Sequence, residues 1–190
     1  MVTEPAELLE RARLTFADPL RLVTDESWER PSGCGVWSVG ALVTHVVGAT
    51  SMYAVVLRGG SGDEGLSTWL ETTTSAGEAS GAFERIAREV ELLLLDPEAP
   101  RQEIHHPAGD VSAEQMITYA LVEWTLHGRD LAQALGTFTS IEPVLAEEIY
   151  RAIEPFLDRF RAFGVFEPAL EVPSTASPSD RLLALVGRAP

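Results

Sequence analysis

The sequence predicts an all-α fold, an antiparallel bundle of four main helices with extra short helices. Apolar residues recur at three- and four-residue spacing through several long segments, and the alternating pattern typical of strands is weak everywhere. At 190 residues the chain is long enough for one well-buried domain and short for two. We therefore expect a single domain over residues 1–190.

The first half of the chain predicts three helices. Apolar spacing predicts a helix over 5–25 that Pro19 bends or interrupts, because proline lacks an amide hydrogen. After the turn-rich loop "WERPSGCGVW", Ser38 is a suitable N-cap for a second helix that ends at a Gly-Gly pair. The segment "SGDEGLSTWLETTTSAGEA" is polar and rich in Gly, Ser and Thr, which predicts a loop with at most a short turn. A third helix is expected over about 80–96, ended by Pro97.

The second half predicts two further long helices and a short one. The stretch "APRQEIHHPAGDV" is expected to form a loop, and the capping-box pattern "SAEQ" begins a helix over 113–135 that Gly136 closes. Apolar spacing predicts another helix over about 141–162. The tail over about 165–190 is expected to be extended and then to form a short helix capped by Ser177.

The charge balance argues against two classes of partner. The chain has 14 Lys and Arg against 29 Asp and Glu, a formal net charge of −15, which repels nucleic-acid phosphates and anionic lipid. No apolar run approaches the roughly 20 residues of a membrane-spanning helix. The first residues lack the basic and then apolar order of a signal peptide, and a single cysteine, Cys34, excludes an internal disulfide. We expect a cytoplasmic protein that binds neither nucleic acid nor membrane.

Three polar side chains lie on otherwise apolar helical faces. Glu123 and His127 are four residues apart and project one above the other, so they either satisfy one another in a core or both face a ligand. His45 lies within the apolar second helix, either as a core histidine with hydrogen-bonded ring nitrogens or as another ligand. A bundle brings the faces of different helices together around its axis, so the three side chains could converge.

Two imidazoles and one carboxylate suit Zn²⁺ or a similar divalent metal. Three protein ligands leave at least one coordination position open, which is typical of a catalytic rather than a structural site. The sequence therefore predicts a metal site formed by His45, Glu123 and His127.

The same stretches resemble a known family. "PSGCGVWSVGALVTHVVG" and "EWTLHGRDLAQALG" resemble two motifs of the mycothiol-dependent maleylpyruvate isomerase N-terminal family, a branch of the DinB-like superfamily. The ending "FEPALEVPSTASPSDRLLALVGRAP" resembles the closing segment of an uncharacterised subfamily. The resemblance implies a DinB-like bundle in which His45, Glu123 and His127 hold a divalent metal, usually zinc. It also implies chemistry that uses the low-molecular-weight thiol mycothiol.

Two residues within the second motif have open roles. Arg129 stands where the family usually has Trp. Facing a cavity it could bind a carboxylate of a cofactor or substrate, and facing water it would offset acidic neighbours; we favour the exposed position. Asp130 either orients the ring of His127 or pairs with a cation.

Five other residues receive less specific expectations. Cys34 has only Arg30 as a basic sequence neighbour, so we expect a small buried residue rather than an activated thiolate. Trp37 and Trp124 are expected to be packing residues. His105 and His106, adjacent in a loop, could add one ligand from outside the bundle but cannot easily both face one ion.

Two functions are compatible with these patterns. The first is a metal-dependent enzyme in which the metal binds a thiol for transfer or isomerisation of a small electrophilic molecule, or binds water for hydrolysis. The second is a non-enzymatic metal-binding or dimerising helical bundle. We favour the enzyme. An open metal position at the base of a solvent-connected cavity would distinguish it from the second.

Overall fold

A computed structural model describes residues 4–97, 103–138, 140–162 and 164–190. The chain forms two compact units, residues 1–138 and 139–190, and each is described by itself. The described residues are mostly helical, as predicted. A single domain over the whole chain stays a prediction.

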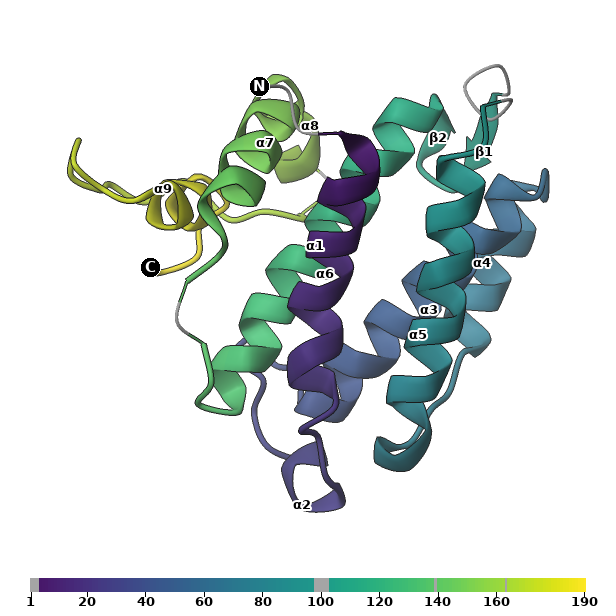
Figure 1. Ribbon diagram of the computed structural model, residues 1–190, viewed down its shortest axis with the longest axis horizontal. Helices are drawn as coiled ribbons and strands as arrows, with labels where there is room; N and C mark the ends of the chain where they lie inside the picture. The colour runs from purple at the N-terminus through teal and green to yellow at the C-terminus, as the bar shows by residue number, and fades with distance from the viewer. Residues whose placement is uncertain (1–3, 98–102, 139, 163) are drawn as a thin grey trace. The chain divides into compact units, whose positions relative to one another are not determined.

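The first unit is a four-helix bundle. Its long helices are α1 (Pro5–Leu20), α3 (Val39–Leu57), α5 (Ala76–Leu94) and α6 (Ala113–Ala134). Helix α1 packs against α5 and α6, and α3 packs against the same two helices, so the four surround one core (Figure 1). Phe83 and Trp124 are completely buried there, with their rings in edge-to-face contact. The predicted bundle is therefore confirmed.

Two short helices accompany the bundle. Helix α2 (Asp25–Trp28) begins at a capping box on Thr24. Helix α4 (Gly62–Glu71) occupies the segment for which the sequence predicts a loop, so that prediction is wrong. The Ser61 hydroxyl accepts a hydrogen bond from the Glu64 amide, and the Glu64 carboxylate accepts one from the Ser61 amide. These local bonds and packing against α3 outweigh the poor helix propensity of Gly, Ser and Thr.

A β-hairpin replaces part of the second predicted loop. Strands β1 (Ile104–His106) and β2 (Gly109–Val111) are antiparallel, with His105 opposite Asp110. Three-residue strands are too short to show an alternating pattern, which explains the wrong prediction of a plain loop.

Glycines allow close packing around α3. An added Cβ at Gly40 would lie 2.4 Å from Nε1 of Trp28, and one at Gly48 would lie 2.6 Å from Cδ1 of Trp69. Helix α3 is also long and apolar enough to cross a membrane, contrary to the expectation that no run approaches that length. However, 72% of its most apolar 18-residue window is buried, as in the core helix of a folded domain.

The second unit contains α7 (Pro143–Ile153), the 3₁₀-helix η2 (Glu154–Phe156), α8 (Leu157–Ala162) and α9 (Pro178–Leu185). The sequence predicts one helix over 141–162, but Pro155 lacks the amide hydrogen needed to continue α7. Ser177 caps α9 as predicted, its hydroxyl accepting a hydrogen bond from the Asp180 amide at 3.1 Å.

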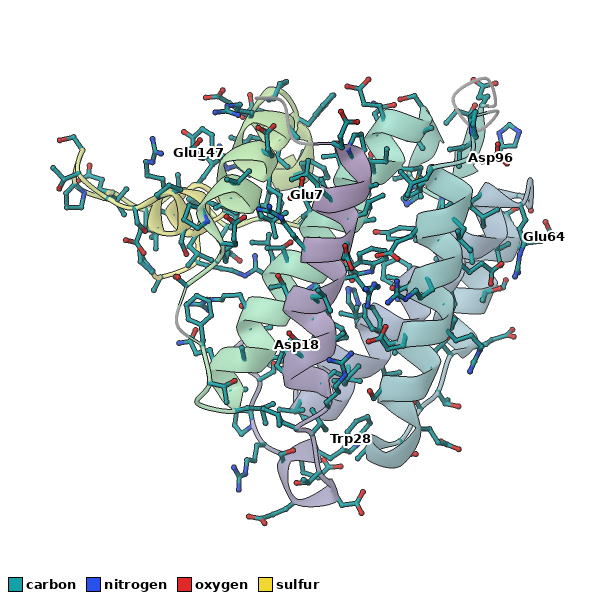
Figure 2. All side chains as sticks on the ribbon, viewed as in Figure 1. Glu7, Asp18, Trp28, Glu64, Asp96 and Glu147 are labelled. Carbon is teal, nitrogen blue, oxygen red and sulfur yellow. The ribbon has the colours of Figure 1, made fainter. Side chains whose placement is uncertain are left out.

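Acidic side chains lie over the outside of the molecule, as the labelled Glu64 and Asp96 show (Figure 2). The first unit nevertheless buries a few charged side chains, among them Arg13, Glu91, Arg129 and Asp130. Arg13 is 1% exposed and donates to Glu91 and Glu84, each at 2.8 Å, which joins α1 to α5.

Candidate metal centre

The structure brings together the three residues that the sequence singles out. His45 comes from α3, and Glu123 and His127 come from successive turns of α6. Glu123 Oε1 lies 3.2 Å from His45 Nε2 and 3.9 Å from His127 Nε2. One ligand atom from each residue lies within 4.8 Å of the other two. We call these three residues the His–Glu–His cluster.

These separations suit a divalent ion. Two nitrogen or oxygen ligands about 2.1 Å from a tetrahedral metal lie about 3.4 Å apart. The two measured carboxylate–imidazole distances lie on either side of this value. The residues present therefore fit the metal that the sequence predicts, although metal binding itself stays a prediction.

Local structure holds the cluster in place. The capping box on Ser112 fixes the first turn of α6, and the four-residue spacing then places Glu123 and His127 on one face. Gly128 lies against the backbone of α1, where an added Cβ would be 2.5 Å from the carbonyl oxygen of Thr15. The segment that carries His127 thus has a fixed distance from α1.

The cluster is neither a sealed core nor an open surface. The side chains of His45, Glu123 and His127 are 21%, 15% and 12% exposed. Partial exposure brings the cluster into contact with solvent and distinguishes His45 from a fully enclosed core histidine. Partial burial strengthens the electrostatic interactions among the three groups compared with bulk water.

Two tryptophans flank His45. The ring centroid of Trp37 lies 4.5 Å from that of His45, and the ring of Trp69 on α4 lies 5.1 Å away on an edge. The sequence predicts a packing role for Trp37 and gives no sign of a site role for Trp69, because the segment around Trp69 is predicted to be a loop. Trp124 is a core residue as predicted, and its indole donates to the Thr50 hydroxyl at 3.0 Å.

Asp130 lies next to both of the partners that the sequence leaves open for it. Its Oδ2 lies 3.5 Å from Nδ1 of His127, and its Oδ1 accepts a hydrogen bond from Arg129 at 3.3 Å. Arg129 itself is only 7% exposed, with its guanidinium over the ring of Phe138, so the expectation that it faces water is wrong. Its salt bridge and cation–π contact make burial of the charge possible.

Cys34 lies beside His127, a position that the sequence does not predict. The thiol sulfur lies 4.0 Å from Nδ1 of His127 and is half-buried, rather than enclosed in the core. Its imidazole neighbour is 93 residues away in the chain, so no local sequence pattern could reveal it.

The two loop histidines lie elsewhere. His105 pairs with Asp110 across the hairpin at 2.8 Å, and this carboxylate raises the pKa of His105. The ring of His106 lies 5.2 Å from that of Tyr119. Neither histidine belongs to a group of potential metal ligands in the described part of the chain, and an added ligand from either stays a prediction.

Tyr53 lies two turns along α3 from His45. Its phenol is buried, and burial raises its pKa well above the usual value, with smaller contributions from the charges of Glu123 and Tyr119. The Tyr53 side chain is therefore neutral at physiological pH and places no further negative charge beside Glu123.

The fold and the cluster define a helical-bundle protein with a group of two histidines and one glutamate arranged as potential metal ligands. The chain belongs to the mycothiol maleylpyruvate isomerase N-terminal domain family, whose model matches residues 9–132. All three residues of the His–Glu–His cluster lie within the matched segment. The resemblance drawn from the sequence is confirmed at the level of the family.

The chain is also similar to known proteins in sequence and in structure. Two uncharacterized proteins, from two strains of Mycobacterium tuberculosis, are each 26% identical over 97% of this chain and 98% of their own length. A crystal structure of the mycothiol-dependent maleylpyruvate isomerase matches with a TM-score of 0.68 at 17% identity, covering 98% of this chain and 90% of that one. A histidine-to-alanine mutant of that enzyme matches with a TM-score of 0.65 at 16% identity, with the same coverage. These structures support the fold.

Proposed function

We propose that this protein is a divalent-metal-dependent enzyme that uses a low-molecular-weight thiol, mycothiol, to transfer or isomerise a small electrophilic substrate. The main support is the convergence of His45, Glu123 and His127 at ligand distances with partial exposure. The chain belongs to the mycothiol maleylpyruvate isomerase N-terminal domain family, which supports mycothiol as the thiol and isomerisation as the reaction class. A cytoplasmic location and zinc as the metal are parts of the same proposal.

His45 Nε2, His127 Nε2 and a Glu123 oxygen would hold the metal. When bound, a divalent ion stabilises the thiolate form of a thiol and so supplies a nucleophile near neutral pH. Asp130 would accept a hydrogen bond from the Nδ1–H of His127, which leaves the lone pair of Nε2 directed at the cluster. The carboxylate of Glu123 would offset one of the two positive charges.

The residues around the cluster would shape the substrate site. Trp37 and Trp69 put aromatic surface beside His45, which would exclude water on those sides and pack against an uncharged substrate portion. A role for Arg129 in binding an anionic group stays a prediction. In the structure its guanidinium contacts Asp130 and Phe138.

Metal analysis with a matched variant tests the proposal. We expect the purified protein to bind about one equivalent of Zn²⁺, and His127→Ala to lose at least about tenfold in affinity because one of three ligands is removed. His105→Ala, which changes a histidine outside the cluster, should leave the affinity unchanged. Equal metal content in wild-type and His127→Ala protein would refute the metal site.

A thiol-consumption assay tests the reaction. Metal-loaded protein is mixed with mycothiol and a panel of small electrophiles, including maleylpyruvate, and loss of thiol and formation of the isomer are followed separately. We expect turnover in wild-type protein and none in a folded His45→Ala variant. Tight metal binding without turnover on any electrophile would favour the non-enzymatic metal-binding bundle.

A further inference from the structure

Cys34 forms a second group of potential ligands with His127 and Asp130. The group combines a thiol from the loop before α3 with an imidazole and a carboxylate from α6. Their ligand atoms all lie within 4.8 Å of one another. We propose that Cys34, His127 and Asp130 form a second cation site, selective for thiophilic ions such as Cd²⁺, that shares only His127 with the His–Glu–His cluster.

The chemistry of the three ligands determines which metal ions the second site prefers. Thiolate is a soft ligand that prefers soft metals, whereas two imidazoles and a carboxylate suit borderline ions such as Zn²⁺. A zinc-sized tetrahedral ion would place sulfur and nitrogen ligands about 3.6 Å apart. Cys34 Sγ lies 4.0 Å from His127 Nδ1, and Asp130 Oδ2 lies 3.5 Å from the same nitrogen. The longer sulfur distance favours an ion larger than zinc.

The backbone presents Cys34 in a fixed position. Gly33 and Gly35 on either side have φ angles of +78° and +56°, a conformation that glycine adopts without strain. Ser32 accepts a hydrogen bond from the Cys34 amide at 3.1 Å and donates one to the Trp37 carbonyl at 2.9 Å. The amide of Trp37 returns a bond to the Cys34 carbonyl. This closed loop keeps the sulfur directed at α6.

Asp130 is also held. Arg129 donates to Oδ1, while Oδ2 faces His127, so a cation could take Oδ2 without breaking the bond to Arg129. Binding would release the thiol proton of Cys34 to solvent and form sulfur–metal, nitrogen–metal and oxygen–metal bonds. No oxidant or reductant is needed.

The shared ring makes the two sites alternatives. A neutral imidazole has one nitrogen with a free lone pair and one that carries the proton. His127 can therefore coordinate through Nδ1 beside Cys34 or through Nε2 beside Glu123, but not through both while it is neutral. A thiophilic ion at the second site would displace His127 from the first. The existence of the second site does not depend on the proposed function.

Titration with Cd²⁺ in thiol-free buffer tests the site. Binding should produce the ultraviolet charge-transfer absorption of a cadmium–thiolate bond with one equivalent of ion. Because Cys34 is the single cysteine of the chain, the band reports on this site alone. We expect no band in Cys34→Ser, at least about tenfold weaker Cd²⁺ binding in Asp130→Asn, and an unchanged band in His45→Ala.

A second measurement needs no variant. Bound Cd²⁺ should slow alkylation of Cys34 by iodoacetamide at least about tenfold, since the metal-bound sulfur is no longer a free thiolate. Absence of the band, or alkylation at the same rate with and without Cd²⁺, would overturn the proposal. A band that disappears in His45→Ala would also overturn it, because the ion would then belong to the first cluster. If the Cd²⁺ band forms as expected but the His–Glu–His cluster binds no Zn²⁺, the result counts against the proposed function and not against the second site.

Discussion

Substitution of Gly128 by alanine measures how closely α6 must approach α1. An added Cβ would lie 2.5 Å from the Thr15 carbonyl oxygen and 2.8 Å from the Phe16 amide nitrogen, and both are backbone atoms that cannot rotate away. Ordinary contact begins near 3.4 Å, so the helices must separate by close to 0.9 Å, the difference between 3.4 and 2.5. Such overpacking costs about 1–3 kcal/mol, partly offset by about 1 kcal/mol of better helix propensity.

The net expectation is a loss of up to about 2 kcal/mol in the free energy of unfolding of the first unit. Urea unfolding followed by tryptophan fluorescence measures it, because Trp28, Trp37, Trp69 and Trp124 all lie within residues 1–138. With a urea slope of about 2 kcal/mol/M, the midpoint should fall by up to about 1 M.

The matched control is Gly81→Ala. Gly81 is an exposed glycine inside α5, and nothing lies within 4 Å of its added Cβ. Only the propensity gain applies there, so stability should rise by up to about 1 kcal/mol. Because His127 precedes Gly128, displacement of α6 should also weaken metal binding in Gly128→Ala and not in Gly81→Ala. If both variants gain stability, the inferred contact between α6 and α1 is wrong.

Three further predictions concern other parts of the first unit. Arg13→Leu removes the guanidinium 2.8 Å from the mostly buried Glu91 and leaves it only Arg88 at 3.8 Å, so the free energy of unfolding should fall by up to about 3–5 kcal/mol in urea titration. Ser61→Ala removes the capping box of α4 and should cost about 1 kcal/mol, with weaker packing of Trp69 on His45 visible in tryptophan fluorescence. NMR titration should give His105 a pKa above its ordinary value, and Asp110→Asn should return this pKa to the ordinary value. Because the pKa of His105 is higher in the folded than in the unfolded protein, the small stabilisation from the His105–Asp110 pair is fully present below the unfolded-state pKa. It is lost as the pH rises through the folded-state pKa.

The His–Glu–His cluster was predictable because each of its parts is local or follows from the fold class. The four-residue spacing fixes the relation of Glu123 to His127, and the helical periodicity of α3 predicts a helix that carries His45. The bundle then needs only to bring α3 against α6, which are neighbours in it. Two helices and one packing contact between them are thus enough to bring the three side chains together.

The errors came from contacts that local sequence does not encode. The composition of α4 predicts a loop, and its helix depends on one capping box and on packing against α3. The burial of Arg129 depends on Phe138, nine residues further on and beyond the helix end. Cys34 reaches His127 only because a glycine-rich loop folds back across the end of α3, and no periodic pattern describes such a loop.

The polar groups of the site form one row across α3 and α6, in which basic and acidic side chains alternate. Arg129 contacts Asp130, Asp130 contacts His127, and His127 and His45 both face Glu123, with successive separations of 3.3, 3.5, 3.9 and 3.2 Å. At the Arg129 end a permanent cation balances the carboxylate. At the Glu123 end the neighbours in this row are imidazoles, which are charged only when protonated. A divalent ion there would supply the positive charge that Arg129 supplies at the other end, in a chain whose net charge is −15.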